Sequence, residues 1–225
     1  RLSGLCKTSF IQRNDVKSLR MRPMELLEWL RREIFWTLDT LTGGKIKSHY
    51  VDIKNIMENF NSLESQINRN KHLRDLLDHA TNNCNYYKDY RHCKSLSEFP
   101  IINKSIIRNN LDSIKSKLYE NQNNHKMSTS GSSGTPFKTL QNTNKKLRNT
   151  ADTIYFKQKA GFEIGFRLYY IRKWFNMHKR SWITTMTRNI VMVNVTEFNE
   201  DYLARLIEKI RFVKSSDHFL FVCFT

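Results

Sequence analysis

The spacing of apolar residues changes near the middle of the chain, and this change is the strongest constraint on the fold. From Pro23 to Tyr119 apolar side chains recur every three or four residues, which is the period of amphipathic helices. After Met127, short runs rich in β-branched and aromatic residues alternate with further helical segments. Because such alternation is typical of α/β domains, we predict an α/β fold in which a mostly helical region precedes the strands.

Individual elements follow from these patterns. Proline favours the first turn of a helix and glycine its end, so the first helix should begin after Pro23 and end at Gly43. The predicted helices are Met24–Leu41, His49 to about Ala80 with a break near Asn68–Asn70, one capped by Asn103 with an apolar face from Ile106 to Leu118, Thr143–Lys159, and one starting at Asn199. The predicted strands are Phe137–Leu140, Phe166–Ile171, Trp182–Met186, Ile190–Val195 and Phe219–Phe224. Residues 82–97 have no clear period and are expected to form a loop.

The same patterns divide the chain into three regions. Residues 1–22 form a basic N-terminal segment, residues 23–120 a mostly helical region, and residues 121–225 an α/β part. A length of 225 residues allows one domain or one and a half, since domains usually run about 100–200 residues.

Positive charge is unevenly distributed along the chain. The 225 residues include 38 Lys and Arg against 21 Asp and Glu, a formal charge of +17. Residues 103–180 carry 16 basic and 4 acidic side chains, and thus +12 of that excess. A basic excess concentrated in one segment favours an anionic partner, although a Lys- and Asn-rich composition also produces solvated basic faces.

A nucleic acid is one candidate for that partner. Aromatic side chains able to stack on bases are interleaved with basic ones, namely Tyr169, Tyr170, Trp174 and Trp182 among Arg167, Arg172, Lys173, Lys179 and Arg180. The same aromatics would serve equally well as strand core, and no recognised RNA- or DNA-binding signature is present. A nucleic-acid-binding module is therefore the weaker alternative.

Several other classes do not fit the sequence. No run of 18 apolar residues occurs, so no transmembrane helix is expected, and Arg1 to Lys7 lack the apolar core of a secretory signal. Four cysteines without a Cys-x-x-Cys pair do not make a disulfide framework, so a reducing cytoplasm is the expected compartment. His79, Cys84, His92 and Cys93 match no usual zinc spacing, and no metal site is predicted from them.

Ser128 to Lys138 contain the densest group of Gly, Ser and Thr residues in the chain. Glycines let the backbone approach a ligand closely, and consecutive amide and hydroxyl donors suit phosphate oxygens. The segment is not a Walker A loop, which requires Gly-Lys followed by Ser or Thr. A flexible Gly/Ser connector is the alternative, but a position between two predicted strands favours a hairpin loop.

Three segments carry motifs in a defined order. Leu73 to Tyr87 follow the pattern L-x-x-L-L-x-H-A and then N-x-P-Y-Y, with Asn85 in place of the proline. Ser95 to Lys104 follow S-L-x-x-F-P-I-x-x-K, and Thr129 to Pro136 read T-S-G-S-S-G-T-P. Together they resemble adenylate-forming enzymes, in particular the phenylacetate–CoA ligase and CapK-like branch of the acyl- and aryl-CoA synthetases. Many members place Lys directly after the loop proline, whereas Phe137 intervenes here.

The resemblance implies an AMP-forming ligase of a branch that often serves capsular or surface polysaccharide synthesis. A carboxylic acid would attack the α-phosphorus of ATP, pyrophosphate would leave, and the acyl group would pass to CoA or another acceptor. ATP and Mg²⁺ are the implied cofactors. The residues implied to contact the ATP phosphates are Thr129, Ser130, Gly131, Ser132, Ser133, Gly134, Thr135 and Lys138. Catalytic residues stay unassigned.

The family's later motifs, including Tyr-Gly-x-x-Glu and the catalytic lysine of the C-terminal domain, have no counterpart before Thr225. We therefore expect residues 1–225 to be the N-terminal part of such an enzyme and to be catalytically incomplete alone. A non-catalytic remnant of a truncated gene is a further alternative.

Overall fold

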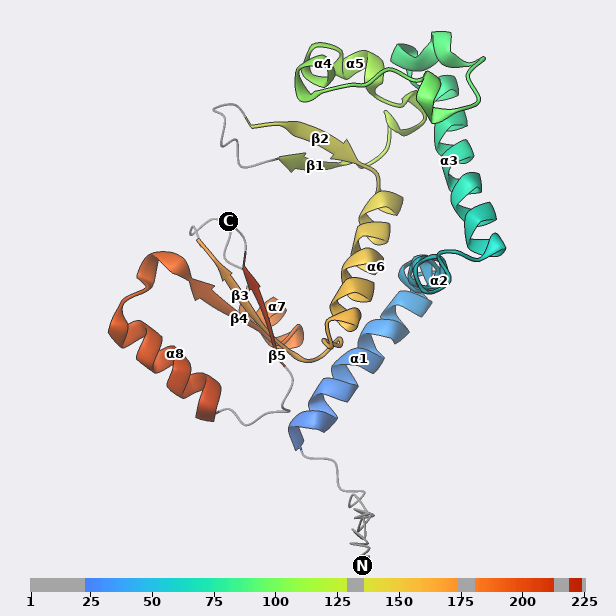
Figure 1. The fold of residues 1–225 in the computed structure, drawn as a ribbon. Coiled ribbons are helices and arrows are strands. Elements are labelled where there is room, and N and C mark those ends of the chain that lie inside the picture. Colours follow the sequence, from blue (N-terminus) through green and yellow to red (C-terminus); the bar gives the residue numbers. More distant parts are fainter. Residues whose placement is uncertain (1–22, 129–135, 174–180, 213–218, 224–225) are drawn as a thin grey trace, which may run out of the picture.

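The computed structural model describes residues 23–128, 136–173, 181–212 and 219–223 (Figure 1). The α-helices are α1 (Pro23–Leu41), α2 (Lys45–Glu58), α3 (Leu63–Asn83), α4 (Lys104–Asn109), α5 (Leu111–Ile114), α6 (Thr143–Lys159), α7 (Trp182–Thr187) and α8 (Glu200–Phe212). The strands are β1 (His125–Ser128), β2 (Lys138–Gln141), β3 (Arg167–Arg172), β4 (Ile190–Asn194) and β5 (Phe219–Cys223). Short 3₁₀ helices are η1 (Asn85–Tyr90), η2 (Leu96–Glu98), η3 (Lys117–Tyr119) and η5 (Val195–Glu197).

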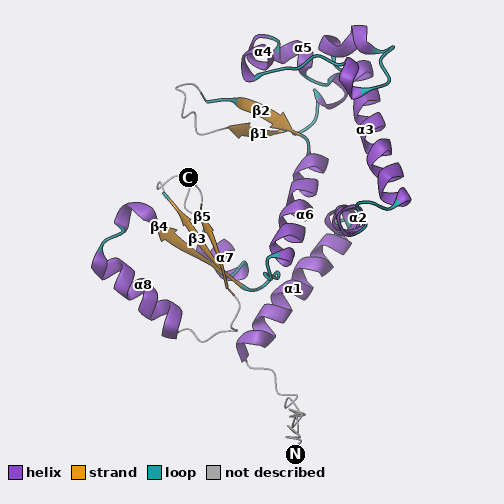
Figure 2. Cartoon of the chain, viewed as in Figure 1, coloured by secondary structure: helices purple, strands orange, loops and turns teal. Residues whose placement is uncertain are grey.

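The strands form two separate sheets. β1 and β2 pair antiparallel as a hairpin, and β4, β3 and β5 form a parallel sheet with β3 in the centre. α7 precedes β4, and α8 connects β4 to β5 on the side of the sheet away from α6 (Figure 2). A helical first half followed by strands and helices confirms the α/β prediction in its general form.

The helical core lies between α2 and α6. Ile53 of α2 and Ala151 and Tyr155 of α6 are buried against one another, and Ile46 and Tyr50 pack around them. The Tyr50 hydroxyl donates to Gln158 Oε1 at 2.6 Å, which satisfies the polar end of a ring that is otherwise in apolar contact. This packing fixes α6, the helix that directly follows the hairpin.

The turn before β3 docks on α1. Gly165 has a φ of +98°, and its backbone lies against the Glu28 peptide so closely that a Cβ would overlap the Glu28 carbonyl group. The Gly165 carbonyl accepts a hydrogen bond from Asn189 Nδ2 at 2.9 Å. Arg32 of α1 also pairs with Glu163 of the same turn. These contacts attach the parallel sheet to the helical half.

Several predicted elements are confirmed. α1 and α6 cover the predicted segments, and β2, β3, β4 and β5 overlap four of the predicted strands. Asn103 caps α4 by accepting from the Ile106 amide at 2.9 Å. Asn199 likewise accepts from the Tyr202 amide at 2.8 Å at the start of α8.

Three predictions about the ends of helices and loops are wrong. The break in the second helical region lies at residues 59–62 instead of Asn68–Asn70, because Ser62 caps α3 by accepting from the Ser65 amide. Residues 82–97 include the end of α3 and η1, so they are not a simple loop. The helix that begins at Asn103 is divided at Asn110 into α4 and α5.

The segment Trp182–Met186, predicted as a strand, is helix α7. Ser181 caps it by accepting from the Thr184 amide at 3.2 Å, and Thr185 Oγ1 donates back to the Trp182 carbonyl at 2.7 Å. The Ser181 cap favours a helix start here, although Ile and Thr prefer strands. Among the described helices, none is long and apolar enough to cross a bilayer.

Candidate functional site

The candidate site is the β1–β2 hairpin, which carries the Gly/Ser/Thr segment at its tip. His125 pairs with Gln141 at the base, and Ser128 pairs with Lys138 at the far end. The expected hairpin is therefore confirmed for its two strands. Seven of the eight predicted phosphate-binding residues, namely Thr129, Ser130, Gly131, Ser132, Ser133, Gly134 and Thr135, lie outside the described residues.

Lys138 is the one predicted site residue that the structure describes. It is the first residue of β2 and is exposed, directly opposite Ser128. Because paired residues of an antiparallel ladder share one face, Ser128 and Lys138 flank the tip from the same face of the hairpin. A lysine at this position adds positive charge beside any ligand held by the tip.

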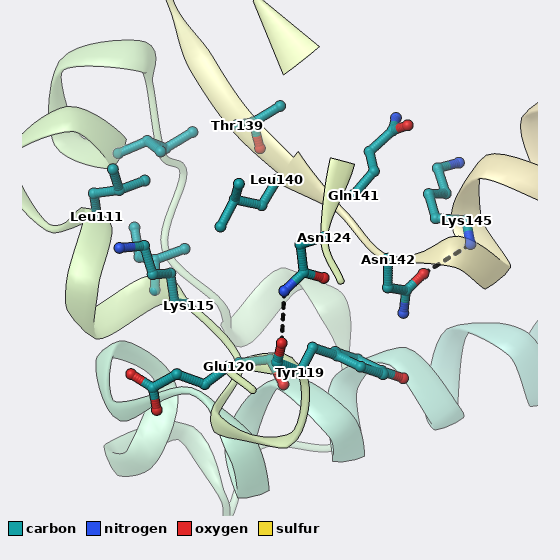
Figure 3. Close-up of a pocket in the computed structure, with 13 residues that line it drawn as sticks. Leu111, Lys115, Tyr119, Glu120, Asn124, Thr139, Leu140, Gln141, Asn142 and Lys145 are labelled. Carbon is teal, nitrogen blue, oxygen red and sulfur yellow. Dashed lines mark hydrogen bonds between the residues drawn. The ribbon is translucent and has the colours of Figure 1, made fainter. Parts of the chain in front are cut away.

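A pocket of about 460 Å³ lies along β2, from Thr139 to Gln141, and extends to Asn142 and Lys145 at the start of α6 (Figure 3). Leu140 of β2 faces Leu111 of α5 across it, with Tyr119 and Lys115 also in its wall. The pocket wall reaches Thr139, which is adjacent to Lys138, so the pocket adjoins the described end of the predicted phosphate site. The buried Ser116 hydroxyl in its wall has no hydrogen-bond partner within the described chain.

Sequence reasoning missed this pocket. The apolar residues Ile107, Leu111 and Ile114 were the only signal, and their spacing predicts a buried helix face rather than a cavity wall. Asn124 closes one side by donating from Nδ2 to the Tyr119 carbonyl at 2.6 Å.

A short connection ties the hairpin to a fixed helix. β2 ends at Gln141, and Asn142 then caps α6 by accepting from the Lys145 amide at 2.8 Å. The cap starts the helix within one residue of the strand end, so movement of the hairpin base is restricted by the packing of α6.

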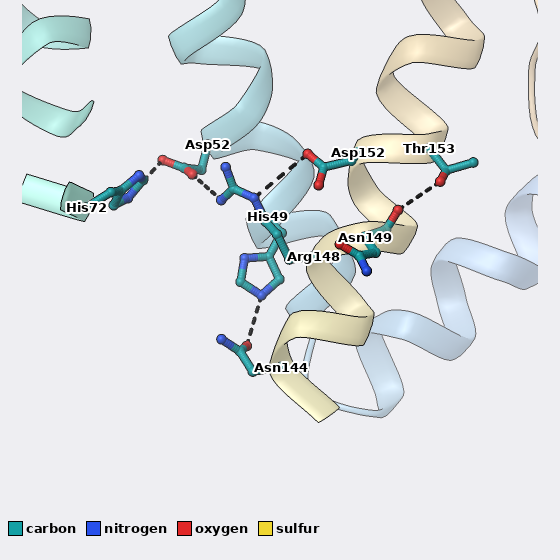
Figure 4. Close-up of polar contacts among 8 residues, drawn as sticks. All are labelled: His49, Asp52, His72, Asn144, Arg148, Asn149, Asp152 and Thr153. Atoms are coloured by element: carbon teal, nitrogen blue, oxygen red, sulfur yellow. Dashed lines mark hydrogen bonds and ion pairs between the residues drawn. The ribbon is translucent and has the colours of Figure 1, made fainter. Parts of the chain in front are cut away.

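Polar contacts add to the packing of α6 against α2 and α3 (Figure 4). Asp52 of α2 pairs with Arg148 of α6 and lies 3.7 Å from the His72 ring of α3. His49 contacts Asn144 Oδ1 at 2.9 Å, close to the first turn of α6. These contacts join three helices around the start of the helix that carries the hairpin.

A second ion pair closes the other end of the α2–α6 contact. Lys159 Nζ lies 2.7 Å from Glu58 Oε1. The hydrogen bond from Lys159 lowers the pKa of Glu58, and the same bond raises the pKa of Lys159. Both groups are exposed, so the pair fixes orientation more than it stabilises the fold.

Two of the three family-like motifs contact each other. Tyr87, from the first motif, lies 6.2 Å from the Phe99 ring of the second, and Tyr90 stacks on Phe99 at 5.6 Å. His79 of the first motif lies on α3 with its ring 5.4 Å from that of Tyr119, beside the pocket wall. These two motifs thus belong to one structural unit.

The aromatic residues of the nucleic-acid alternative differ in exposure where they are described. Tyr169 is 2% exposed in the core of the parallel sheet, whereas Trp182 is 71% exposed on α7. Trp174, Lys179 and Arg180 lie outside the described residues. Tyr169 is therefore unavailable for base stacking.

No group of three His, Cys, Asp or Glu side chains within the described ranges is arranged to hold a metal ion. Of the four residues considered for zinc, His92 and Cys93 are adjacent, and Cys84 is buried. Burial raises the pKa of the Cys84 thiol, so it stays protonated near neutral pH.

Comparisons with protein-family models, with curated proteins and with solved structures found no match to this chain.

Proposed function

We propose that this chain binds the polyphosphate of ATP at the tip of the β1–β2 hairpin, as part of an AMP-forming ligase that activates a carboxylic acid. The observation that supports this proposal is the antiparallel register, which brackets the Gly/Ser/Thr segment with Ser128 and Lys138. A tip of this composition offers backbone amides, hydroxyls and a nearby ammonium group, which are the donors that phosphate oxygens accept.

In the adenylation step the protein's side chains and backbone amides do not form covalent bonds to the substrates. A carboxylate attacks the α-phosphorus of ATP, pyrophosphate leaves, and the acyl-adenylate passes its acyl group to CoA or another acceptor. The protein contributes mainly positioning and stabilisation of charge on the departing pyrophosphate. Mg²⁺ supplies further charge neutralisation when it is bound to the nucleotide.

The direction of the parallel sheet is compatible with a nucleotide near the hairpin. In α/β sheets, ligands commonly bind beyond the carboxyl ends of the strands. β3 runs from Arg167 to Arg172, and its carboxyl end points toward the part of the molecule that carries the hairpin (Figure 1). A surface polysaccharide precursor is a candidate acyl acceptor on the motif resemblance alone.

Equilibrium titration of the chain with ATP and with inorganic tripolyphosphate tests the binding step. We expect both ligands to bind and AMP to bind more weakly, because the β- and γ-phosphates supply most of the charge. Lys138→Ala should weaken ATP binding roughly ten-fold or more, the effect of one charge-assisted hydrogen bond. Gly131→Ala should weaken it as well, by blocking close approach of the backbone.

Lys126→Ala is the matched control. Lys126 is exposed on the same hairpin and the same face, two residues further from the tip, where it pairs with Leu140. Loss of affinity in Lys138→Ala but not in Lys126→Ala supports a site at the tip. Equal losses in both variants would mean non-specific attraction to a basic protein, and absence of ATP binding would overturn the proposal.

A further inference from the structure

Helix α1 packs inward through a side that includes Glu28, Asp39 and Trp36, and it exposes a row of large aliphatic residues. Glu28 and Asp39 are buried, and the Asp39 carboxylate accepts hydrogen bonds from the amides of Ile46 and Lys47 at the start of α2. The large apolar residues that α1 leaves 43–77% exposed include Leu27, Leu30, Ile34, Leu38 and Leu41. We call these five residues the α1 stripe. A surface helix normally shows the reverse arrangement, with its apolar face on the core.

The contacts described above explain this orientation. Gly165 and Glu163 in the turn before β3 hold one side of α1, and the start of α2 is capped by Asp39. α6 and that turn lie on this same side in Figure 1, and the opposite side of α1 faces away from the described chain. The stripe is therefore a surface that the fold presents outward.

The stripe is symmetric along the sequence. Leu27 and Leu41 lie seven residues to either side of Ile34, and Leu30 and Leu38 lie four residues to either side. At 100° per residue, all five lie within about 40° of Ile34 around the helix axis and extend over about 21 Å. Reversing the direction of the helix about Ile34 thus reproduces the same pattern.

A two-fold symmetric interface requires this kind of self-complementarity. In such an interface residue i contacts residue j of the second copy, and residue j contacts residue i. In an antiparallel pair of α1 helices, Leu27 would face Leu41, Leu30 would face Leu38, and Ile34 would face itself. Every apolar residue of the stripe then meets an apolar partner.

Few charged residues surround the α1 stripe, which favours its burial in an interface. Among the exposed positions between Trp29 and Leu41, Glu33 is the only ionisable residue, and the other polar ones are Thr37 and Thr40. Charge depletion of this kind marks the cores of interfaces. The exposed fractions correspond to roughly 500 Å² per copy, so a pair would bury about 1,000 Å², the lower bound for a specific interface.

We propose that the α1 stripe pairs antiparallel with the α1 stripe of a second copy of this chain, with the two-fold axis at Ile34. This inference is independent of the proposed nucleotide site. Sedimentation of the full chain over a range of concentrations should show conversion of the 26.9 kDa monomer to a dimer of about 54 kDa.

Ile34→Glu should raise the dimer dissociation constant more than ten-fold, because it opposes two carboxylates at the axis. Ile101→Glu is the matched control, since Ile101 is 98% exposed and lies outside the stripe. It should leave the dimer unchanged. Circular dichroism verifies that both variants keep their helices.

Mixing experiments test the antiparallel register. Ile34→Glu chains mixed with Ile34→Lys chains should regain dimers that neither forms alone. Leu27→Glu mixed with Leu41→Lys should do so as well, because those positions face each other only when the helices run antiparallel. A monomeric wild-type chain, equal loss of dimer in Ile101→Glu, or no recovery in the second mixture would overturn the proposal.

Discussion

The contact between Gly165 and α1 gives the sharpest prediction for stability. In Gly165→Ala the new Cβ would lie 2.9 Å from the Glu28 carbonyl carbon and 3.1 Å from the Glu28 Cα, and it would overlap the carbonyl oxygen. A positive φ of +98° adds strain of about 1–2 kcal/mol for any residue with a Cβ. Overpacking against backbone adds about 1–3 kcal/mol, so the free energy of unfolding should fall by about 2–5 kcal/mol.

Gly43→Ala separates the cost of backbone strain from the cost of overpacking. Gly43 has a nearly identical φ of +101°, and a Cβ there would meet no atom within 4 Å. In Gly43→Ala the free energy of unfolding should therefore fall only by the cost of backbone strain. Urea unfolding followed by circular dichroism measures both variants, and an extra loss of 2 kcal/mol corresponds to a midpoint lower by about 1 M. Equal midpoints for the two variants would refute the docking of this turn on α1.

Three further predictions test the helices and contacts that support the hairpin. Asn142→Ala should lower the free energy of unfolding by about 1 kcal/mol through loss of the α6 cap, measured by urea unfolding. Because the pKa of Glu58 is lowered in the fold, its pairing with Lys159 contributes above the ordinary pKa of 4.5 and is lost as the pH falls through the lowered value. Glu58→Gln should remove that acid-side dependence of stability, and unchanged dependence would contradict the pairing. Alkylation mapped by mass spectrometry should modify Cys93 in the folded chain and the buried Cys84 only after unfolding.

Local signals predicted the elements whose ends are set by one or two residues. α6 matches its predicted range because Asn142 caps it and its apolar positions keep helical spacing to Tyr155. The hairpin was predicted from the position of the Gly/Ser/Thr segment between strand-like runs, and the register of β1 and β2 agrees with it. In these cases, hydrogen bonds between residues that are close in sequence set the ends of the elements.

Other features depend on hydrogen bonds that a periodic pattern does not reveal. The asparagines near residues 68–70 predict a break, but Arg69 in that stretch donates to the Phe60 carbonyl at 3.0 Å and stacks on the Phe60 ring. In α7, threonine hydroxyls donate back to helix carbonyls, as Thr187 does to Ile183 at 2.8 Å. Such back-bonding does not itself favour a helix, so the start of α7 is set by the Ser181 cap.

The orientation of α1 required tertiary information. Its spacing predicts an amphipathic helix, but the Gly165 and Asp39 contacts show that the side carrying Glu28 and Asp39 packs inward. The pocket beneath Leu140 likewise arises from segments that are distant in sequence. Of the predicted phosphate-binding residues, the structure describes Lys138, at the first position of β2.

The most direct test of the nucleotide proposal is amide chemical-shift mapping of the isotopically labelled chain during ATP titration. The account predicts saturable shifts concentrated at residues 128–138, with the largest at Gly131 and its neighbours and little change at Lys126. Saturable shifts that centre instead on Arg167 to Lys173, or no shifts at all, would contradict a phosphate site at the tip of the hairpin.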